Sequence, residues 1–539
     1  MKRSWRIAAI LLFILALVAG GVLGDRLLAL TDQTRDTLRL YTELVNVAHD
    51  RYGADVSYRD LVYASIQGMI HTLDPHTNFL QAEDYQGMRE KQQTTYYGLG
   101  ILVGPRNGLL TVIAPLAGTP AARMGIQPGD VISTIEGEPT ETMSLDEAVQ
   151  KLKGPKGTQV HITIARRGID KPIEMAVTRA EIPQTTVRET YMITPTTGYV
   201  QVTEFGRGTG NEMAEAIDKL KGQGMKQLLI DLRNNGGGLL DPAIEISEEL
   251  LPEGSTIVET RGRTRDSQQT YRVTGRRSHF DMPVVVLVNE GTASASEIVA
   301  GAVQDHDRGL IVGEPSWGKG LVQTVYNLAY GTGLALTTAK YYTPSGRLIQ
   351  RDYSSYWDYL FTRSDAGSPE ITGKKVQQDQ VFKTDLGRKV YGGGGITPDV
   401  VVVDDKLSAA EQFLLARNAF TNFAVDYSRR HPVKSADWKP GPDALKDFHD
   451  WLVHESIATA QEVDDALAQP AARDYALLQI RGEMMNIAFG QEARHRALAA
   501  GDKQLSAALG LFDRAAALLK ERRELDRTAN IRQTVARSR

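Results

Sequence analysis

The chain has 539 residues, of which 42% are hydrophobic and 24% charged, so it is long enough for several domains with ordinary globular cores. Its formal net charge of -4 and its pI near 6.3 argue against nucleic acid as a partner. The absence of cysteine excludes disulfides, thiolate nucleophiles and thiolate metal sites.

The N-terminus has the pattern of a membrane anchor. Basic Lys2, Arg3 and Arg6 precede an uncharged stretch at residues 7–24, which as a helix would span roughly 27 Å, close to the thickness of a bilayer core. We interpret residues 1–24 as a signal anchor that crosses the inner membrane once and leaves the rest of the chain on the exported, periplasmic side. A cleaved signal peptide that releases a secreted protein is the alternative.

Residues 25–90 are predicted to be helical. Leu38, Tyr41, Val45 and Ala48 recur on one helical face, and Ser57, three residues before Asp60, marks the start of a second helix.

Residues 91–180 change to short strands and turns. Ser144 and Glu147 form a capping box for a short helix between predicted strands. The order of elements resembles a PDZ domain, and Gly98, Leu99, Gly100 and Ile101 match its carboxylate-binding loop. The resemblance implies that the N–H groups of this loop bind the free C-terminus of a protein or peptide, which adds as a strand beside the helix. A small β domain with an incidental glycine loop is the alternative.

Residues 181–403 alternate strands and helices and predict an α/β core. A buried strand at residues 227–231 runs into the glycine-rich loop 232–238, and a helix follows. That order places a site at the C-terminal end of the strand.

A serine and a lysine in this core have the ingredients of a nucleophile and its base. Ser294 lies between the buried strand at residues 284–288 and a helix of small residues, and Lys319 lies between two glycines. A serine nucleophile needs a base and N–H donors for the oxyanion, and the amide of Ala295 at the helix start is one such donor. Burial would favour the neutral form of Lys319 that a base requires.

Four motifs, at residues 232–238, 291–297, 318–323 and 342–346, together resemble the C-terminal processing (tail-specific) serine peptidases. The resemblance implies a ClpP/crotonase-like α/β core with an inserted PDZ domain and helical terminal regions. It also implies roles for single residues, with Ser294 as the nucleophile, Lys319 as the base, Gln323 as the group that orients the lysine, and Ala295 with Gly237 or Gly238 as the oxyanion donors. It implies no metal and no organic cofactor.

Residues 404–539 are predicted to be helical. Phe413, Phe420, Phe423 and Tyr427 form an apolar stripe, which we interpret as a packing face or a dimer surface. A homodimer through the helical regions is therefore a possible assembly.

Other readings compete with this one. Ser294 can be a simple helix cap, with Ser296 as the nucleophile instead. His306, between Asp305 and Asp307, offers a Ser-His-Asp triad, although we expect these three residues at an exposed helix end. A catalytically silent PDZ scaffold or chaperone that binds C-termini, and a hydratase of the crotonase type, are the alternative functions. No His-Glu-x-x-His motif is present, which argues against a zinc peptidase.

Overall fold

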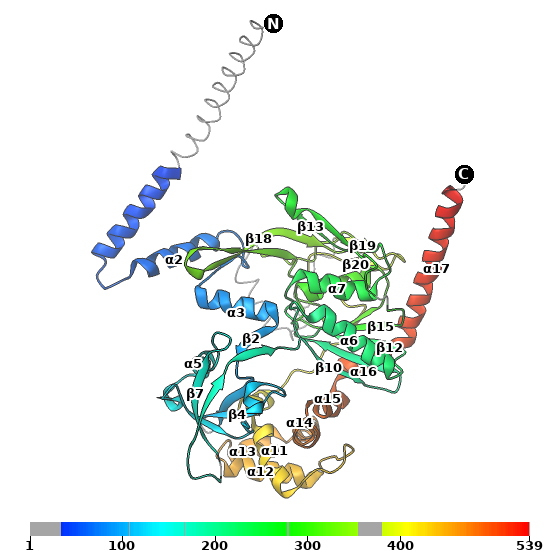
Figure 1. The fold of residues 1–539 in the computed structure, drawn as a ribbon. Coiled ribbons are helices and arrows are strands. Elements are labelled where there is room, and N and C mark those ends of the chain that lie inside the picture. Colours follow the sequence, from blue (N-terminus) through cyan, green and yellow to red (C-terminus); the bar gives the residue numbers. More distant parts are fainter. Residues whose placement is uncertain (1–33, 107, 167, 278–279, 354–379, 538–539) are drawn as a thin grey trace. The chain divides into compact units, whose positions relative to one another are not determined.

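The computed structural model describes residues 34–537 except residues 107, 167, 278–279 and 354–379 (Figure 1). The chain forms two compact units, one of residues 1–81 with 324–336 and one of residues 82–323 with 337–539. No helix within the described ranges is long and apolar enough to cross a membrane. Residues 1–24, which the sequence predicts to be an anchor, lie outside these ranges.

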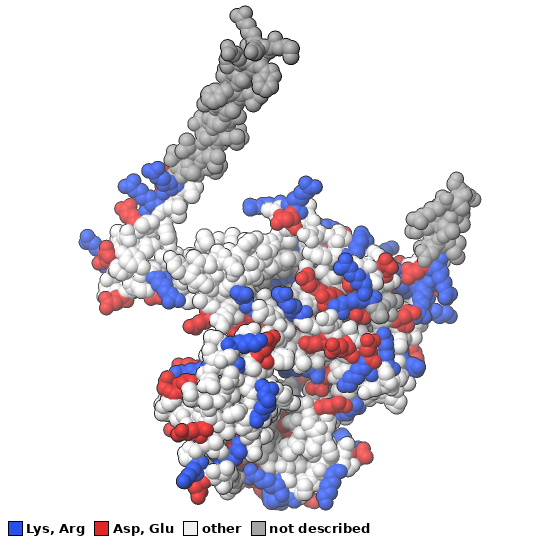
Figure 2. All heavy atoms as spheres, in the orientation of Figure 1, with Lys and Arg blue, Asp and Glu red and all other residues white. Residues whose placement is uncertain are grey.

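The first unit contains a helix over residues 34–51, helix α2 (Tyr58–Ile70) and strand β1 (Asn78–Leu80), which pairs with the first residues of β18 (Gly333–Tyr342). The predicted cap of α2 is present, because the Asp60 amide donates to Ser57 Oγ at 3.1 Å. Figure 2 shows an almost uncharged surface over α2 and the start of β18. Apolar side chains contribute to it, and Tyr330 is 94% exposed.

The second unit begins with α3 (Ala82–Gln93) and a small β domain. Strands β2 (Thr95–Gly98) and β9 (Ala180–Pro183) pair where the chain enters and leaves this domain. Its sheet has the order β3-β4-β5-β7-β8, with the short β6 (Glu138–Pro139) beside β5. The elements are β3 (Ile101–Arg106), β4 (Leu109–Pro115), α4 (Pro120–Arg123), β5 (Val131–Ile135), α5 (Leu145–Leu152), β7 (Gln159–Ala165) and β8 (Ile173–Thr178).

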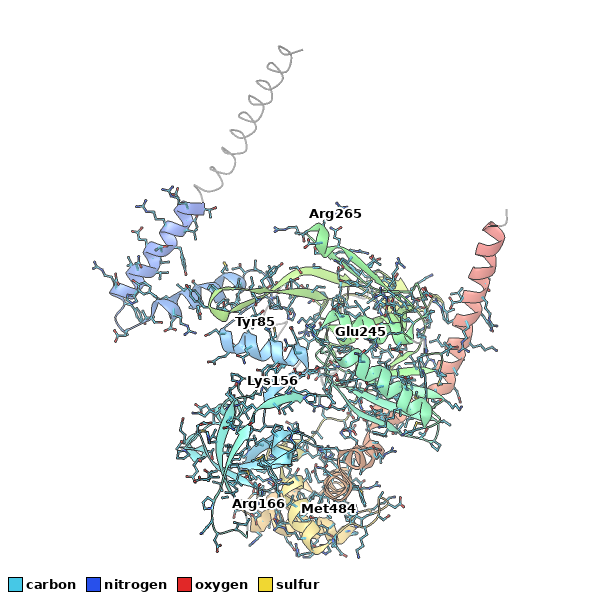
Figure 3. All side chains as sticks on the ribbon, viewed as in Figure 1. Tyr85, Lys156, Arg166, Glu245, Arg265 and Met484 are labelled. Carbon is cyan, nitrogen blue, oxygen red and sulfur yellow. The ribbon has the colours of Figure 1, made fainter. Side chains whose placement is uncertain are left out.

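The interior of this domain follows from alternation along its strands. Val160, Ile162 and Ile164 of β7 point to one face and are almost fully buried. The predicted capping box of α5 is present, with the Ser144 amide donating to Glu147 Oε2 at 2.8 Å. Arg166, labelled in Figure 3, directly follows β7 and forms an ion pair with the buried Asp130.

The central sheet has the order β10-β11-β12-β15-β16-β21. Strand β10 is antiparallel to β11, and the strands from β11 to β21 are parallel to one another. Its strands are β10 (Val187–Met192), β11 (Thr197–Val202), β12 (Gln227–Asp231), β15 (Val284–Val288), β16 (Leu310–Gly313) and β21 (Val400–Val401). All five residues of β15 are buried, as expected for a strand covered on both faces. The polar loops at the C-terminal ends of these strands form the site described below.

Helices cover both faces of the central sheet. One core cluster joins α6 (Thr209–Gly222), α7 (Leu240–Leu250) and α8 (Ala295–Asp305) to alternate strand residues such as Val284 and Val286. The other joins α16 (Lys503–Leu509) and α17 (Phe512–Arg537) to the opposite set, including Val285 and Leu287. The last helices of the chain therefore complete the core that the sequence placed between residues 181 and 403.

Three groups of elements complete the second unit. Strands β13 (Thr256–Gly262) and β14 (Gln269–Arg272) pair, and β13 also pairs with the last residues of β18, which follows β17 (Leu321–Asn327). Strands β19 (Val381–Lys383) and β20 (Lys389–Tyr391) form a hairpin. Helices follow as α10 (Ala409–Ala416), α11 (Ala419–Arg430), α12 (Pro442–His454), α13 (Ala460–Ala466), α14 (Pro470–Phe489) and α15 (Gln491–Leu498). The aromatic stripe packs inside this group through Phe420, Phe423 and Tyr427, and Met484, labelled in Figure 3, joins that core.

Candidate active site

Ser294 occupies a strained turn between β15 and α8. Its backbone has φ 58° and ψ -117°, a combination that residues other than glycine rarely adopt. The amides of Glu297 and Ile298 donate to the Ser294 carbonyl at 2.9 and 3.1 Å, so the helix begins directly after the serine. Its side chain is partly exposed, whereas the helix that follows is buried. Such strain at a strand-to-helix junction is typical of a functional position.

The glycine loop that follows β12 lies against this turn. Gly237 has φ +93°, and a Cβ at this position would lie 2.7 Å from Ser294 Cβ and 2.8 Å from the Ala295 nitrogen. Only glycine fits such an approach. The structure therefore brings Ser294, Ala295 and Gly237 together, as the sequence predicts.

Asn235 holds the loop and the turn in register. Its carbonyl accepts from the Ala293 amide at 3.0 Å and from Ser296 Oγ at 2.9 Å, and its side-chain oxygen accepts from the Gly237 amide at 2.9 Å. Ser296 is fully buried, and its hydroxyl is used in this contact. Of the two competing serines, Ser294 is therefore the accessible one.

Lys319 lies on the loop between β16 and β17. Its Nζ donates to Gln323 Oε1 at 2.9 Å, and both side chains are partly buried. The predicted pairing of Lys319 with Gln323 is thus present as a contact.

Glu297 connects the serine turn to the lysine loop. Its carboxylate accepts four hydrogen bonds, from the amides of Ser294, Gly318 and Lys319 at 2.8, 2.7 and 2.9 Å and from Ser316 Oγ at 2.5 Å. Burial raises the pKa of Glu297 above its usual value, while these four hydrogen bonds act in the opposite direction. Sequence reasoning missed this role, although a charged residue three positions after Ser294 in a helix of small residues was its signal.

A second network holds the glycine loop from the other side. Arg233 donates to Asp231 and to Asp502, the N-cap of α16, and Asp231 also accepts from the Tyr199 hydroxyl at 2.8 Å. Asp231 is only 1% exposed, so this ion pair is shielded from water. The C-terminal helices are thereby connected to the loop that lies beside Ser294.

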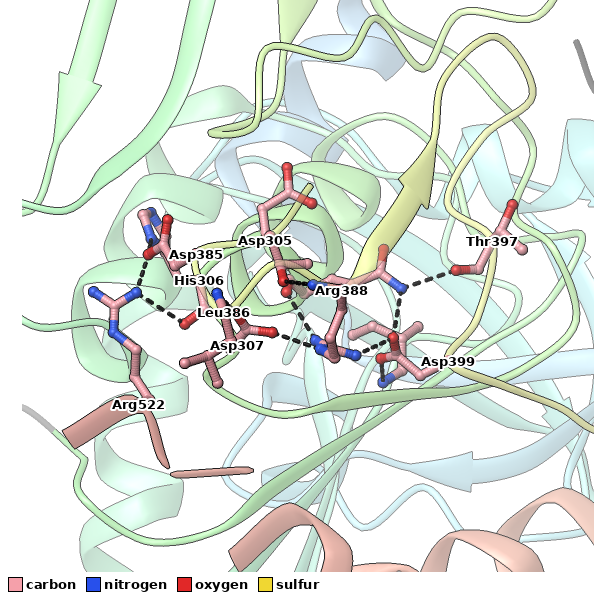
Figure 4. Close-up of polar contacts among 12 residues, drawn as sticks. Asp305, His306, Asp307, Asp385, Leu386, Arg388, Thr397, Asp399 and Arg522 are labelled. Carbon is pink, nitrogen blue, oxygen red and sulfur yellow. Dashed lines mark hydrogen bonds and ion pairs between the residues drawn. The ribbon is translucent and has the colours of Figure 1, made fainter. Parts of the chain in front are cut away.

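The residues of the rival Ser-His-Asp triad lie at the opposite end of α8 (Figure 4). Asp305 pairs with the fully buried Arg347 at 2.7 Å, and Asp307 pairs with Arg388 at 2.5 Å. His306 contacts the Thr256 carbonyl at 2.7 Å and Asp385, to which Arg522 of α17 also binds.

The expectation that this helix end is exposed was wrong. Its aspartates lie at the negative end of the helix dipole and are stabilised by arginines that cover them. His306 itself is only 8% exposed. Because its ring is hydrogen-bonded at the far end of the helix, His306 is not placed to act as the base for Ser294.

The predicted carboxylate-binding loop enters β3. The carbonyls of Leu99 and Gly100 accept from the amides of Ala121 and Leu116 at 3.0 and 2.8 Å. In a trans peptide the following N–H points the opposite way, so the amides of Gly100 and Ile101 point away from these partners. Gly100 has φ +73°, and a Cβ there would overlap Thr119, which explains the second glycine of the loop.

A serine at a strained turn lies beside a glycine loop, and the Glu297 carboxylate bonds this turn to the loop that carries Lys319. Two family models match the chain, Peptidase family S41 over residues 196–353 and PDZ domain over residues 111–166. The chain is 39% identical to the carboxy-terminal-processing protease of Bartonella bacilliformis, over 58% of this chain and 70% of that relative.

One further relative and one solved structure are also similar to the chain. Identity to the carboxy-terminal processing protease CtpA of Bacillus subtilis is 32%, over 72% of this chain and 85% of that one. Among solved structures, a photosystem II D1 C-terminal processing protease is 28% identical, with 66% of this chain and 85% of that chain covered and a TM-score of 0.35. The chain belongs to the C-terminal processing peptidases and is a serine-type peptidase with an S41 peptidase fold and a PDZ domain. The finer likeness of its core to ClpP and crotonase stays a prediction.

Proposed function

We propose that this C-terminal processing peptidase cleaves its substrates with a dyad of Ser294 and Lys319. Neutral Lys319 takes the hydroxyl proton as Ser294 Oγ attacks the carbonyl carbon of the scissile peptide. The lysine then gives that proton to the departing amine as the C–N bond breaks, and water hydrolyses the acyl-enzyme. The observation that carries this proposal is the Glu297 carboxylate, which bonds the serine turn and the lysine loop at once.

The oxyanion donors follow from the same turn. The Ala295 amide lies at the start of α8, where the helix dipole favours negative charge. In the present conformation the Gly237 amide donates to Asn235, so the second donor we favour is Gly238. Gln323 orients the lysine through its hydrogen bond to Nζ.

The PDZ domain supplies selection of C-terminal tails. Strand β3 lies at the edge of its sheet, so a peptide can pair with it as a further strand. The amides of Gly100 and Ile101 would then bind the terminal carboxylate, beside Gly98 and Leu99 of the same loop. Protein and peptide C-termini are the partners in this scheme.

Residues 1–24 would hold the enzyme at the inner membrane with its domains on the periplasmic side, or, if they are cleaved, direct it to secretion. The support is their uncharged stretch behind basic residues. Resistance of the membrane-bound chain to carbonate extraction tests the anchor.

Self-association through the helical regions is supported by exposed apolar side chains, including Leu40 and Leu44 of the helix over residues 34–51. Light scattering of the purified chain over a range of concentrations tests it, and a constant monomer mass would contradict it.

Tail-directed cleavage is tested with one unstructured polypeptide made with a free or an amidated C-terminus. We expect faster cleavage of the free form at low substrate concentration and no cleavage of either by Ser294→Ala. Equal rates for both forms would contradict tail capture. Binding without any cleavage by the wild type would favour the PDZ scaffold, and turnover of acyl-CoA that survives Ser294→Ala would favour the hydratase.

A further inference from the structure

Tyr341 contacts the main chain of both residues of the proposed dyad. This tyrosine lies near the end of β18 and is 2% exposed. Its hydroxyl donates to the Ser294 carbonyl at 3.0 Å and is also hydrogen-bonded to the Lys319 carbonyl. A phenol has one proton, so two carbonyl oxygens from the serine turn and the lysine loop share a single donor.

The backbone of Tyr341 holds the same loop. Its amide donates to the Gly320 carbonyl at 2.9 Å, one residue beyond Lys319. On its other side β18 pairs with β13, with Tyr341 opposite Thr260, so the tyrosine is fixed by a strand ladder. The hydroxyl is therefore presented from a rigid element, which is what precise positioning requires.

The contact at Ser294 has a consequence for the oxyanion donor. The Ser294 carbonyl and the Ala295 amide belong to one peptide plane and point in opposite directions. Two amides of α8 already donate to this carbonyl, and the tyrosine hydroxyl adds a third donor that further constrains the direction of the Ala295 N–H. The contact with the Lys319 carbonyl fixes the backbone position from which the lysine side chain extends.

We propose that Tyr341 is a positioning residue, whose hydroxyl fixes the distance and orientation between the Ser294 turn and the Lys319 loop. This inference rests on the proposed dyad. It adds to the Glu297 carboxylate of α8 a second connection between the same two segments, made by a neutral group on strand β18.

The test is Tyr341→Phe, which removes one oxygen and keeps the buried ring. Tyr342→Phe is the matched control, because this neighbour directs its ring to Arg261 at 4.1 Å. We expect kcat, and the rate of fluorophosphonate labelling per reactive site, to fall about tenfold in Tyr341→Phe, as for a lost hydrogen bond, while KM changes less than twofold. Tyr342→Phe should match the wild type.

Several results would overturn the proposal. Wild-type rates in Tyr341→Phe would do so, and so would a raised KM with an unchanged kcat. A smaller fraction of labelled protein with an unchanged labelling rate for that fraction would show that Tyr341 has a purely structural role. Should Tyr341→Phe fold poorly, a fluorinated tyrosine at 341 keeps the shape and ionises at lower pH. Its labelling rate should then fall, relative to the wild type, as the pH rises through that ionisation, and an unchanged profile would contradict the role. Labelling that survives in Ser294→Ala would instead refute the dyad itself.

Discussion

The two ends of helix α8 are held by different chemistry. At its N-terminal end the Glu297 carboxylate accepts from three amides and one hydroxyl, and within the described part of the chain it forms no ion pair. At its C-terminal end Asp305 and Asp307 are each paired with an arginine. The helix dipole explains the difference, because it favours an anion at the first end and opposes one at the other.

We expect this difference to separate effects on catalysis from effects on stability. The neutral donors around Glu297 set the positions of short backbone segments beside Ser294, so their loss should cost rate. The ion pairs at the other end are buried, so removal of one partner leaves an unpaired charge and should cost folding free energy. Substitutions at the two ends should thus give opposite patterns of activity and stability.

The largest effect is expected at the loop that Glu297 holds. Lys319→Arg keeps the positive charge, but the guanidinium stays protonated and does not act as a base, so kcat should fall by about 10³-fold or more. The free energy of unfolding should change by less than about 1 kcal/mol. Steady-state kinetics and urea unfolding measure both, with Lys340→Arg on the exposed side of β18 as the control. Retained turnover would exclude Lys319 as the base.

The next effect is at the far end of the helix. Arg347→Met leaves the buried Asp305 without its cation and should lower the free energy of unfolding by about 3–5 kcal/mol. The value of kcat per folded molecule should stay within about twofold of the wild type. The exposed Arg265→Met is the control (Figure 3). If Arg347→Met were as stable as the wild type but inactive, the two ends of α8 would not differ in their effects on activity and stability as we expect.

Glu297→Gln sharpens the comparison at the catalytic end. The amide keeps the shape, but its NH₂ group faces donors and loses charge-assisted hydrogen bonds, so kcat should fall about 10²-fold.

The raised pKa of Glu297 gives the sign of the pH effect on stability. The folded protein takes up this proton more readily than the unfolded chain, so stability is gained as the pH falls through the folded-state pKa.

Activity should move in the opposite direction, since the ionised carboxylate is the form that accepts all four hydrogen bonds. Protonation of Lys319 lowers kcat on the acid side in both proteins, and protonation of Glu297 should add a second loss in the wild type that is absent in Glu297→Gln. The pH dependence of kcat for the two proteins measures it. If kcat falls in the same way on the acid side in both proteins, protonation of Glu297 does not limit activity.

The smallest effect concerns the last helix. Arg522 of α17 binds Asp385 in a partly exposed pair, so Arg522→Met should lower the free energy of unfolding by about 1 kcal/mol and leave kcat unchanged. Denaturant titration measures the loss, with Lys520→Met, which removes a nearby exposed cation, as the control. A loss of kcat instead would connect α17 to the catalytic end.

Local patterns in the sequence were sufficient for much of this description. The five apolar residues of β15, the small residues of α8 and the glycines around Lys319 predict a strand, a helix and a loop near one another, and the structure has them. The capping box of α5 was equally local. Its two residues are three positions apart, so the sequence alone is enough to predict it.

Contacts between distant segments were not predictable in this way. Glu297 accepts from residues 19 to 22 positions away, and Arg233 bonds Asp502 across 269 positions. An amphipathic helix shows that one face is buried but not what covers it, so the packing of α16 and α17 on the central sheet went unseen. The ion pairs that bury Asp305 and Asp307 were missed for the same reason.

The most direct test of the central claim is peptide mass spectrometry after labelling with a fluorophosphonate. The dyad predicts one adduct, on Ser294, which is absent in Ser294→Ala and forms about 10³-fold more slowly in Lys319→Arg. An adduct on Ser296, or a labelling rate that does not depend on Lys319, would contradict it.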